Sequence, residues 1–156
     1  MLNKSETGIY YLEDQASTEN SNYTNENLKN ILDLRKNKEE AIDYYLELLE
    51  ENLKDHNLQE FDIVTSVPDN QDDYISEGIK KLLKKLSSKH EKLEFVQCLD
   101  RSGNTINSCC KDLKNKNILL FDYVATKGTS LKACKETLKS AEANLIVCIA
   151  LQKSSL

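Results

Sequence analysis

The chain has 156 residues, 39% of them hydrophobic and 30% charged, and this length supports one domain around one core. The formal net charge of −5 argues weakly against bulk nucleic-acid binding, which needs cations to neutralise phosphates, but it leaves a small phosphorylated ligand open. No apolar run reaches the length of a membrane span, and the N-terminus lacks the apolar core of a signal peptide, so we expect a cytoplasmic protein.

The N-terminal third predicts a short strand, a polar segment and a long helix. Residues 9–12 favour a strand, whereas residues 13–27 are rich in Ser, Thr, Asn and Glu and predict a loop or a mobile flap. The apolar cluster at 28–34 fits either a short helix or a strand. From about residue 38 to 55, apolar residues recur on one helical face. These are Ile42, Tyr45, Leu46, Leu49 and Leu53.

The middle of the chain predicts a strand followed by a helix. Residues 61–67 are apolar and β-branched, and Pro68 ends that strand because proline cannot donate to the ladder. An acidic loop over 69–73 precedes a helix predicted from about Tyr74 to Ser87. Its inward face consists of Ile75, Ile79, Leu82, Leu83 and Leu86. Its outer face carries Lys80, Lys81, Lys84 and Lys85, which we interpret as a solvated face rather than a nucleic-acid patch.

Residues 93–99 predict a third strand. The polar stretch 100–116 that follows predicts a long loop, and loops of this length are often functional lids.

Residues 118–131 have a composition typical of a strand, a polar loop and the start of a helix. Residues 118–121 are apolar and predict a buried strand, and Asp122 is placed where that strand ends. A helical period begins at Leu131 and continues with Cys134, Leu138 and Ala141. This arrangement gathers backbone N–H groups at a helix N-terminus, which favours a phosphate site over a simple hydroxyl cap.

The last predicted strand covers residues 144–151. The alternation of strands and helices predicts an α/β fold with three layers, in which helices flank both faces of a mainly parallel sheet. We expect a single domain over 1–156, with an N-terminal strand and flap region over 1–37 and an α/β core over 38–156.

The chain has five cysteines, an odd number without a C-x-x-C pair, which argues against a disulfide framework or a structural zinc site. Cys134 and Cys148 fall on apolar faces and are expected to be buried. Cys109 and Cys110 are adjacent in a polar segment, so a redox role and two plain surface thiols both stay open.

The run Asp122-Tyr123-Val124-Ala125-Thr126-Lys127-Gly128-Thr129-Ser130-Leu131 resembles the ribose-phosphate-binding signature of type I phosphoribosyltransferases. In that family an apolar strand ends in two acidic residues, followed by a hydrophobic pair, a loop rich in Thr, Gly and Ser, and a helix. The run Asp62-Ile63-Val64-Thr65-Ser66-Val67-Pro68 is similar to the strand before the family's pyrophosphate loop, and its Val-Pro ending resembles the ComF-like branch. The resemblance covers roughly residues 24–153.

This resemblance implies binding of phosphoribosyl pyrophosphate (PRPP) with Mg²⁺, transfer of its phosphoribosyl group to a nitrogenous base, and release of pyrophosphate. Asp122 would be the catalytic residue and would contact the ribose together with Tyr123. The metal would be held through PRPP rather than by the protein directly, and relatives are commonly homodimers. The 5-phosphate loop would be Ala125, Thr126, Lys127, Gly128, Thr129 and Ser130. The pyrophosphate loop would be Ser66, Val67, Pro68, Asp69 and Asn70, and Arg101 and Lys111 would contribute from a hood over 100–116. Family pyrophosphate loops often contain a strained non-proline cis peptide.

Three positions depart from the family pattern. Tyr123 replaces the second acid, Asp69 belongs to an acidic loop where basic residues are common, and Glu142 stands where a glycine usually ends the helix. The residues therefore support three hypotheses. A divergent phosphoribosyltransferase comes first because the phosphate loop is largely intact, a non-catalytic sensor of PRPP or a nucleotide follows closely, and hydrolysis of a phosphoribosyl ligand comes last because no nucleophile–base pair is visible.

Overall fold

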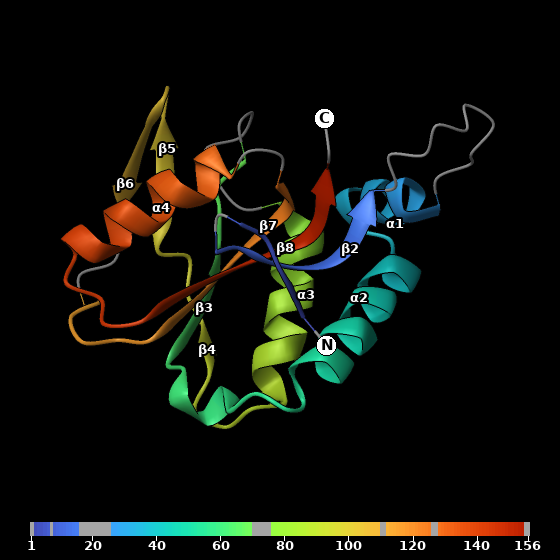
Figure 1. Cartoon of the computed structure of the whole chain (residues 1–156), viewed down its shortest axis with the longest axis horizontal. Helices are drawn as coiled ribbons and strands as arrows, with labels where there is room; N and C mark the ends of the chain where they lie inside the picture. The colour runs from blue at the N-terminus through green and yellow to red at the C-terminus, as the bar shows by residue number, and fades with distance from the viewer. Residues whose placement is uncertain are drawn as a thin grey trace.

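The computed structural model describes residues 2–6, 8–15, 26–69, 76–109, 112–125 and 128–154, apart from the side chains of Asp14 and Gln15. Within these ranges the sheet has the order β1-β2-β8-β7-β3-β4 (Figure 1). Its strands are β1 (Asn3–Lys4), β2 (Tyr10–Gln15), β3 (Ile63–Ser66), β4 (Glu94–Phe95), β7 (Ile118–Ala125) and β8 (Ile146–Ser154). The helices are α1 (Glu26–Arg35), α2 (Glu39–Leu53), α3 (Glu77–Ser88) and α4 (Thr129–Ser140), with a 3-10 turn η1 at Leu58–Glu60.

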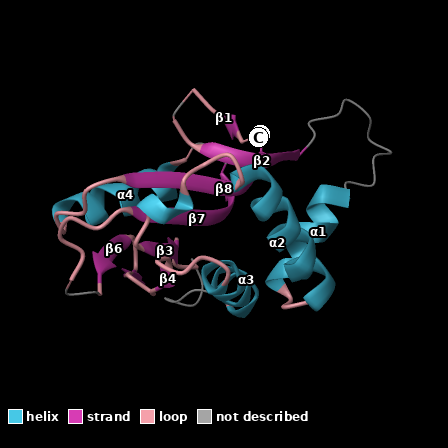
Figure 2. Cartoon of the chain, turned by 90° about the horizontal axis from the view of Figure 1, so that it is seen from below, coloured by secondary structure: helices cyan, strands magenta, loops and turns pink. Residues whose placement is uncertain are grey.

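The sheet separates two layers of helices, which confirms the predicted α/β architecture. Among the described strands of this sheet, β2, β8, β7, β3 and β4 run parallel, and the short β1 is antiparallel to β2. Buried residues of α1, α2 and α3 share one core cluster with Leu119, Phe121 and Tyr123, whereas those of α4 share the other with Ile118 and Leu120. Alternate residues of β7 therefore face opposite layers. Figure 2 shows α4 lying apart from the other three helices.

The connections leave the central strands β3 and β7 in opposite directions. β3 continues through α3 to β4 on one side, and β7 continues through α4 to β8 on the other. The two strands themselves pair in parallel from Ile63↔Ile118 to Ser66↔Phe121. Their carboxyl ends thus form a topological switch point, the place where open α/β sheets bind ligands.

Several predicted element boundaries are wrong. The strand that was expected to end at Asp122 continues through Ala125, because β7 keeps pairing with β8 up to Ala125↔Lys153. The strand predicted over 93–99 is limited to β4, and Leu99 already belongs to the next strand. The apolar cluster at 28–34, for which the sequence allowed either a helix or a strand, lies within the helix α1. The loop or flap predicted over 13–27 is wrong at both ends, because residues 13–15 belong to β2 and residues 26–27 belong to α1. Its middle at 16–25, the predicted helix start at Tyr74 with Ile75, and Cys110 lie outside the described residues.

The hood is a β-hairpin rather than the predicted long loop. β5 (Leu99–Ser102) and β6 (Thr105–Ser108) pair antiparallel, and a two-residue turn joins them. Gly103 takes the first turn position with a φ of 60°, the conformation that a tight hairpin of this type demands of its first residue. The hydroxyl of Thr137 on α4 donates to the backbone oxygen of Ile106 at 3.4 Å, which places the hairpin against that helix.

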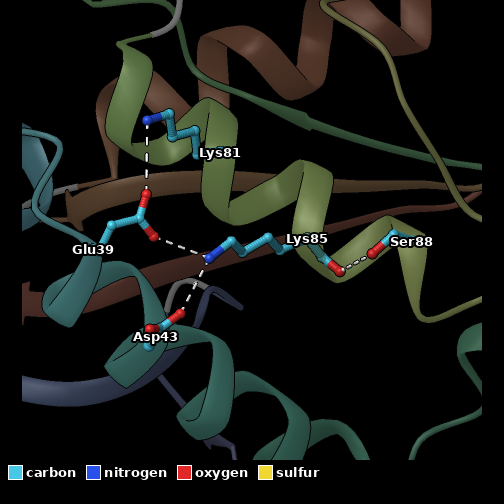
Figure 3. A network of polar contacts seen from close by, with 5 residues as sticks. All are labelled: Glu39, Asp43, Lys81, Lys85 and Ser88. Atoms are coloured by element: carbon cyan, nitrogen blue, oxygen red, sulfur yellow. Dashed lines mark hydrogen bonds and ion pairs between the residues drawn. The ribbon is translucent and has the colours of Figure 1, made fainter.

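The lysine-rich side of α3 is not simply solvated. Lys85 contacts Glu39 at 3.1 Å and Asp43 at 3.2 Å, and Lys81 lies 3.8 Å from Glu39 (Figure 3). Two of the four lysines therefore tie α3 to α2, whereas Lys84 stays exposed. Because these pairs are solvent-accessible, each contributes little to stability.

Two helices end on residues other than glycine that adopt left-handed conformations. Asn37 after α1 has a φ of 62° and Glu142 after α4 has a φ of 67°. The backbone N–H of Glu142 donates to Lys139 at 2.9 Å and that of Ala143 donates to Leu138 at 3.2 Å, the pair of bonds that defines a Schellman ending. Glu142 thus terminates α4 in the geometry that a glycine would otherwise provide.

Gly78 permits a close approach between α3 and the end of α1. A Cβ atom at this position would lie 1.8 Å from the backbone oxygen of Leu34, the residue before Arg35. Since a backbone oxygen cannot rotate away as a side chain can, any larger residue must push the two helices apart.

We expect Gly78→Ala to lower the free energy of unfolding by roughly 1–3 kcal/mol, because the forced separation of α1 and α3 outweighs alanine's higher helix propensity. Urea unfolding followed by circular dichroism would measure the change. The exposed substitution Ser88→Ala on the same helix is the control and should stay within about 0.5 kcal/mol of the parent. Equal or greater stability of Gly78→Ala would contradict the close approach.

Candidate functional site

A cleft of about 230 Å³ opens at the carboxyl ends of β3 and β7. It is lined by Arg35, Val67, Pro68, Asp69, Ser76, Arg101, Asp122, Tyr123, Val124 and Ser130. These residues come from α1, the segment after β3, the start of α3, the hairpin, β7 and α4. The cleft therefore occupies the topological switch point described above.

The structure brings together residues from each of the segments that the sequence singled out. Val67, Pro68 and Asp69 of the predicted pyrophosphate loop share the cleft with Asp122 and Tyr123 of the predicted ribose site. They also share it with Arg101 of the hood and Ser130 of the predicted 5-phosphate loop. Segments separated by more than fifty residues in the chain thus converge on one opening.

Other predicted site residues lie beside the cleft or outside the described ranges. Ser66 is buried, and its hydroxyl donates to the backbone oxygen of Phe121 at 3.1 Å, which joins β3 to β7. Ala125 is the buried last residue of β7 rather than a loop residue. Gly128 and Thr129 stand at the N-terminus of α4. Asn70, Lys111, Thr126 and Lys127 lie outside the described residues.

Asp122, which lines the cleft, carries a carboxyl group with a perturbed pKa. Burial raises its pKa to about 6, and the neighbouring Asp69 acts in the same direction. The backbone N–H of Tyr123, which donates to Oδ1 at 2.8 Å, and the guanidinium groups of Arg35 and Arg101 counter that rise. A carboxyl that titrates near neutral pH inside a cleft is a typical functional-site feature.

Tyr123 points away from Asp122, because adjacent residues of a strand face opposite sides of the sheet. Its hydroxyl contacts the hydroxyl of Ser76, which precedes α3, and burial raises its pKa while a hydrogen bond from the backbone of Ile79 opposes that shift. The phenol oxygen therefore lies at the N-terminus of α3. Above the ring, the Arg35 guanidinium lies 4.5 Å from the centroid, within cation–π distance.

Arg101 reaches the cleft from the hairpin on the α4 side of the sheet. Its Nε atom is buried and lacks a hydrogen-bond partner among the described residues. Buried donors are paired in most proteins, and an unpaired one at the edge of a cleft indicates a group that a bound anion would satisfy.

Sequence reasoning missed Arg35 and Ser76. Arg35 follows the apolar cluster at 28–34, whose secondary structure the pattern left undecided, so the direction of its side chain was not predictable. Ser76 was assigned to the interior of a helix that was predicted to begin at residue 74, whereas it is the residue before α3. An N-cap preference for serine was the available signal at this position.

The N-terminus of α4 offers backbone donors next to the cleft. Gly128 precedes the helix with a φ of 73°, and it has no side chain to cap the first turn. The first intrahelical bond runs from the N–H of Lys132 to the oxygen of Gly128 at 2.9 Å. The N–H groups of the first turn, which includes Ser130, are those that an α-helix leaves without intrahelical partners, and such groups bind anions.

Among the described residues, no group of three or more His, Cys, Asp or Glu side chains is arranged to hold a metal ion. The two carboxylates of the cleft, Asp69 and Asp122, still suit Mg²⁺, which is commonly held by one or two carboxylates together with substrate phosphates. In the described part of the chain no peptide bond is cis, and this includes those joining Ser66 to Asp69. No helix in the described ranges is long and apolar enough to cross a membrane.

No protein-family model matches the chain, and no curated protein matches it. Among solved structures it is similar to a purine phosphoribosyltransferase from Pyrococcus horikoshii Ot3 (20% identity over 74% of this chain and 76% of that one, TM-score 0.49). It is also similar to an adenine phosphoribosyltransferase from Saccharomyces cerevisiae complexed with D-2,5-dideoxy-2,5-imino-altritol 1,6-bisphosphate and adenine (19% identity over 72% of this chain and 65% of that one, TM-score 0.47). A third similar structure is a hypoxanthine phosphoribosyltransferase from Staphylococcus aureus (17% identity over 80% of this chain and 64% of that one, TM-score 0.45). The chain spans less than two thirds of the second and third structures, and similarity at this level assigns neither a family nor an activity.

The raised pKa of Asp122 predicts a stability that depends on pH. Its carboxyl titrates at about 6 when folded and near 3.8 when unfolded, so folding loses stability as pH rises from about 4 to 6. Asp122→Asn removes this cost, and we expect it to stabilise the protein by roughly 1–3 kcal/mol at pH 7.5 and by much less at pH 4.

Denaturant titrations at the two pH values would test this, with the exposed substitution Asp55→Asn as the control. If Asp122→Asn changed stability equally at both pH values, the carboxyl would not titrate in this range.

Proposed function

We propose that this chain is a type I phosphoribosyltransferase of the ComF-like branch, which binds PRPP and transfers its phosphoribosyl group to a nitrogenous base. One observation carries the proposal. The cleft at the switch point joins Asp122 and Ser130 of the ten-residue run to Arg101 of the hairpin and to Asp69 of the segment after β3. A chance resemblance over ten residues would not require these distant segments to meet.

The 5-phosphate of the ligand would lie at the N-terminus of α4. Backbone N–H groups of the first helical turn and the hydroxyls of Thr129 and Ser130 would donate to it, and the helix dipole favours its negative charge. Gly128 has a φ of 73°, which glycine adopts readily, and its lack of a side chain permits close approach of a phosphate. We assign Thr126 and Lys127 to the same loop from the sequence pattern.

The ribose would lie over Asp122. A carboxylate there would accept hydrogen bonds from the ribose hydroxyls and would oppose the positive charge that develops on the ring as the bond from C1 to pyrophosphate breaks and a bond to the base nitrogen forms. Its pKa of about 6 leaves most molecules ionised at neutral pH. Tyr123 brings no charge to this position, so Asp122 acts without the second acid of the family pattern.

The pyrophosphate would lie between the segment after β3 and the hairpin. Arg101 would donate to it through the buried Nε atom that lacks a partner among the described residues. When Mg²⁺ accompanies PRPP, it would neutralise pyrophosphate charge, and Asp69 is the carboxylate of this segment that would lie beside it. The acidic residue at this position, which would otherwise repel pyrophosphate, is thereby compatible with binding.

A second candidate function is a sensor that binds PRPP or a nucleotide without turnover. The specific observation in its favour is the position of the Tyr123 phenol, which contacts Ser76 at the start of α3 instead of facing the ribose site. A site that keeps its phosphate contacts but has one acid for the developing charge would bind well and react slowly.

Release of pyrophosphate from PRPP and Mg²⁺ with a panel of purine, pyrimidine and nicotinate-like bases tests the enzyme. We expect Asp122→Asn to abolish release while the protein stays folded, because the amide cannot balance positive charge on the ring. The exposed Asp55→Asn variant should remain active. Absence of pyrophosphate release with every base would leave the sensor as the remaining function.

Calorimetry with PRPP tests the ligand position for both functions. We expect Gly128→Val to abolish binding, because a β-branched residue at a φ of 73° distorts the phosphate loop. Asn115→Val is the matched control, since the exposed Asn115 has a left-handed φ of 63° and does not line the cleft. Unchanged PRPP affinity in Gly128→Val would move the ligand elsewhere.

A further inference from the structure

Two cysteines lie opposite each other at the base of the hairpin formed by β5 and β6. The pairing of the two strands ends at Leu99↔Ser108, and the next pair in the same register is Cys98 with Cys109. The backbone N–H of Cys109 donates to the oxygen of Cys98 at 2.8 Å, so the two residues still pair one step beyond the strands. Figure 1 shows the hairpin beside α4.

The register brings these two side chains within reach of a disulfide. Directly opposed residues of an antiparallel pair have Cα atoms about 4.5–5.5 Å apart, and disulfides span about 4.4–6.8 Å between Cα atoms. Opposed side chains also lie on the same side of the ribbon, with Cβ atoms about 4.5–5.5 Å apart. That separation slightly exceeds the Cβ distance of a relaxed disulfide, so a cross-link here would be strained and readily reduced.

The two thiols differ in their access to solvent, which sets the order of a reaction. Cys109 is exposed, and its thiol donates at 3.2 Å to the backbone oxygen of Gln97, in the peptide group that leads into Cys98. Cys98 is fully buried, and its backbone N–H donates to the hydroxyl of Thr65 on β3 at 3.3 Å. An oxidant in solution would therefore meet Cys109 first, and Cys98 would react second.

The other cysteines that the structure describes, Cys134 and Cys148, lack this arrangement. Cys134 belongs to α4 and Cys148 pairs with Leu120 on β7, so neither faces a cysteine in a strand register. Burial raises the pKa of Cys134 to about 12 and also raises the pKa of Cys148. Because the thiolate is the reactive form, both are expected to be inert.

We propose that Cys98 and Cys109 form a reversible disulfide that fixes the base of the hairpin under oxidising conditions. With glutathione disulfide as the oxidant, the Cys109 thiolate attacks one of its sulfur atoms, forms a mixed disulfide and releases one glutathione thiolate. The Cys98 thiolate then attacks the Cys109 sulfur and releases the second glutathione thiolate. Two protons pass from the protein thiols to the two glutathione thiolates, so the protein pair is oxidised and glutathione disulfide is reduced.

The cross-link would fix the strand that carries Arg101. Cys98 joins the start of β5 to β3 through Thr65, and Cys109 follows the returning strand β6. A covalent bond between them would prevent the two strands from separating at their base. Arg101 belongs to β5 and lines the cleft, so oxidation would restrict the movement of its guanidinium. The inference does not rest on the proposed function, because it concerns the frame of the cleft whatever ligand binds there.

Peptide mapping by mass spectrometry tests the cross-link. Trypsin cleaves the chain so that Cys98 lies in peptide 93–101 and Cys109 lies in peptide 102–111. The second peptide also holds Cys110, so the folded Cys110→Ser variant is treated with glutathione disulfide, alkylated and digested. We expect the two peptides to be joined by a bond that dithiothreitol cleaves. Cys109→Ser, which keeps Cys110 and changes an exposed residue, is the matched control and should lose the link.

Two further measurements on Cys110→Ser separate a disulfide that the fold selects from random oxidation. The ratio of linked to unlinked peptide should be about 10- to 100-fold higher in the folded chain than in urea, because the hairpin already closes the loop that the unfolded chain must close. Hydrogen exchange over residues 99–108 should slow on oxidation, since local opening of the hairpin is restricted. The same treatment should leave exchange in Cys109→Ser unchanged.

Several results would overturn this inference. Equal linkage in Cys109→Ser and Cys110→Ser would mean that the strand register does not select the partner of Cys98. Glutathione that stays on Cys109 without a link to Cys98, or equal linkage in the folded and the unfolded chain, would also contradict it. A link that leaves hydrogen exchange unchanged would show that the bond does not fix the hairpin. Absence of PRPP binding would overturn the proposed function and leave the disulfide unaffected.

Discussion

The parallel pairing of β3 with β7 is the constraint on which the candidate site depends. The backbone N–H of Val67 donates to Phe121 at 2.8 Å, and the buried hydroxyl of Ser66 donates to the same oxygen at 3.1 Å. These bonds bring the segment after β3 level with Asp122, so the two ends open into one cleft. Because α3 and α4 then leave toward opposite faces, neither helix covers the opening, and both of their N-termini lie beside it.

Strand alternation explains why two adjacent residues of β7 have different roles. Pairing with β8 continues to Ala125, so Asp122 and Tyr123 are strand residues that face opposite layers. Asp122 remains in the cleft, where burial destabilises its charge. Tyr123 packs below α1 and α3, joins the start of α3 through Ser76, and supports Arg35. Tyr123, which stands where the family pattern has a second acid, thus contacts Arg35 at the end of α1 and Ser76 at the start of α3.

Periodicity predicted the layers but not the direction of particular side chains. The apolar run of β7 and the spacing of Leu131, Cys134 and Leu138 predicted a strand and a helix that the structure contains. The hairpin was missed because Gly103-Asn104 lies in a polar stretch whose alternation is weak, although this dipeptide is a turn signal. The place of Arg35 in the cleft could not be predicted, because it depends on the contact between α1 and Gly78, which no local sequence pattern encodes.

The distribution of charge in the cleft favours a ligand that is itself highly charged. Two arginines and two aspartates share it, the pKa of Asp122 is raised by burial, and the Nε atom of Arg101 has no partner among the described residues. A neutral ligand would leave these groups poorly solvated, which is costly in a partly buried site. A phosphorylated sugar would satisfy the arginines, and its hydroxyls would satisfy Asp122. The charged residues of the cleft are therefore those that would recognise a phosphoribosyl ligand, as in sites that bind through preorganised charge.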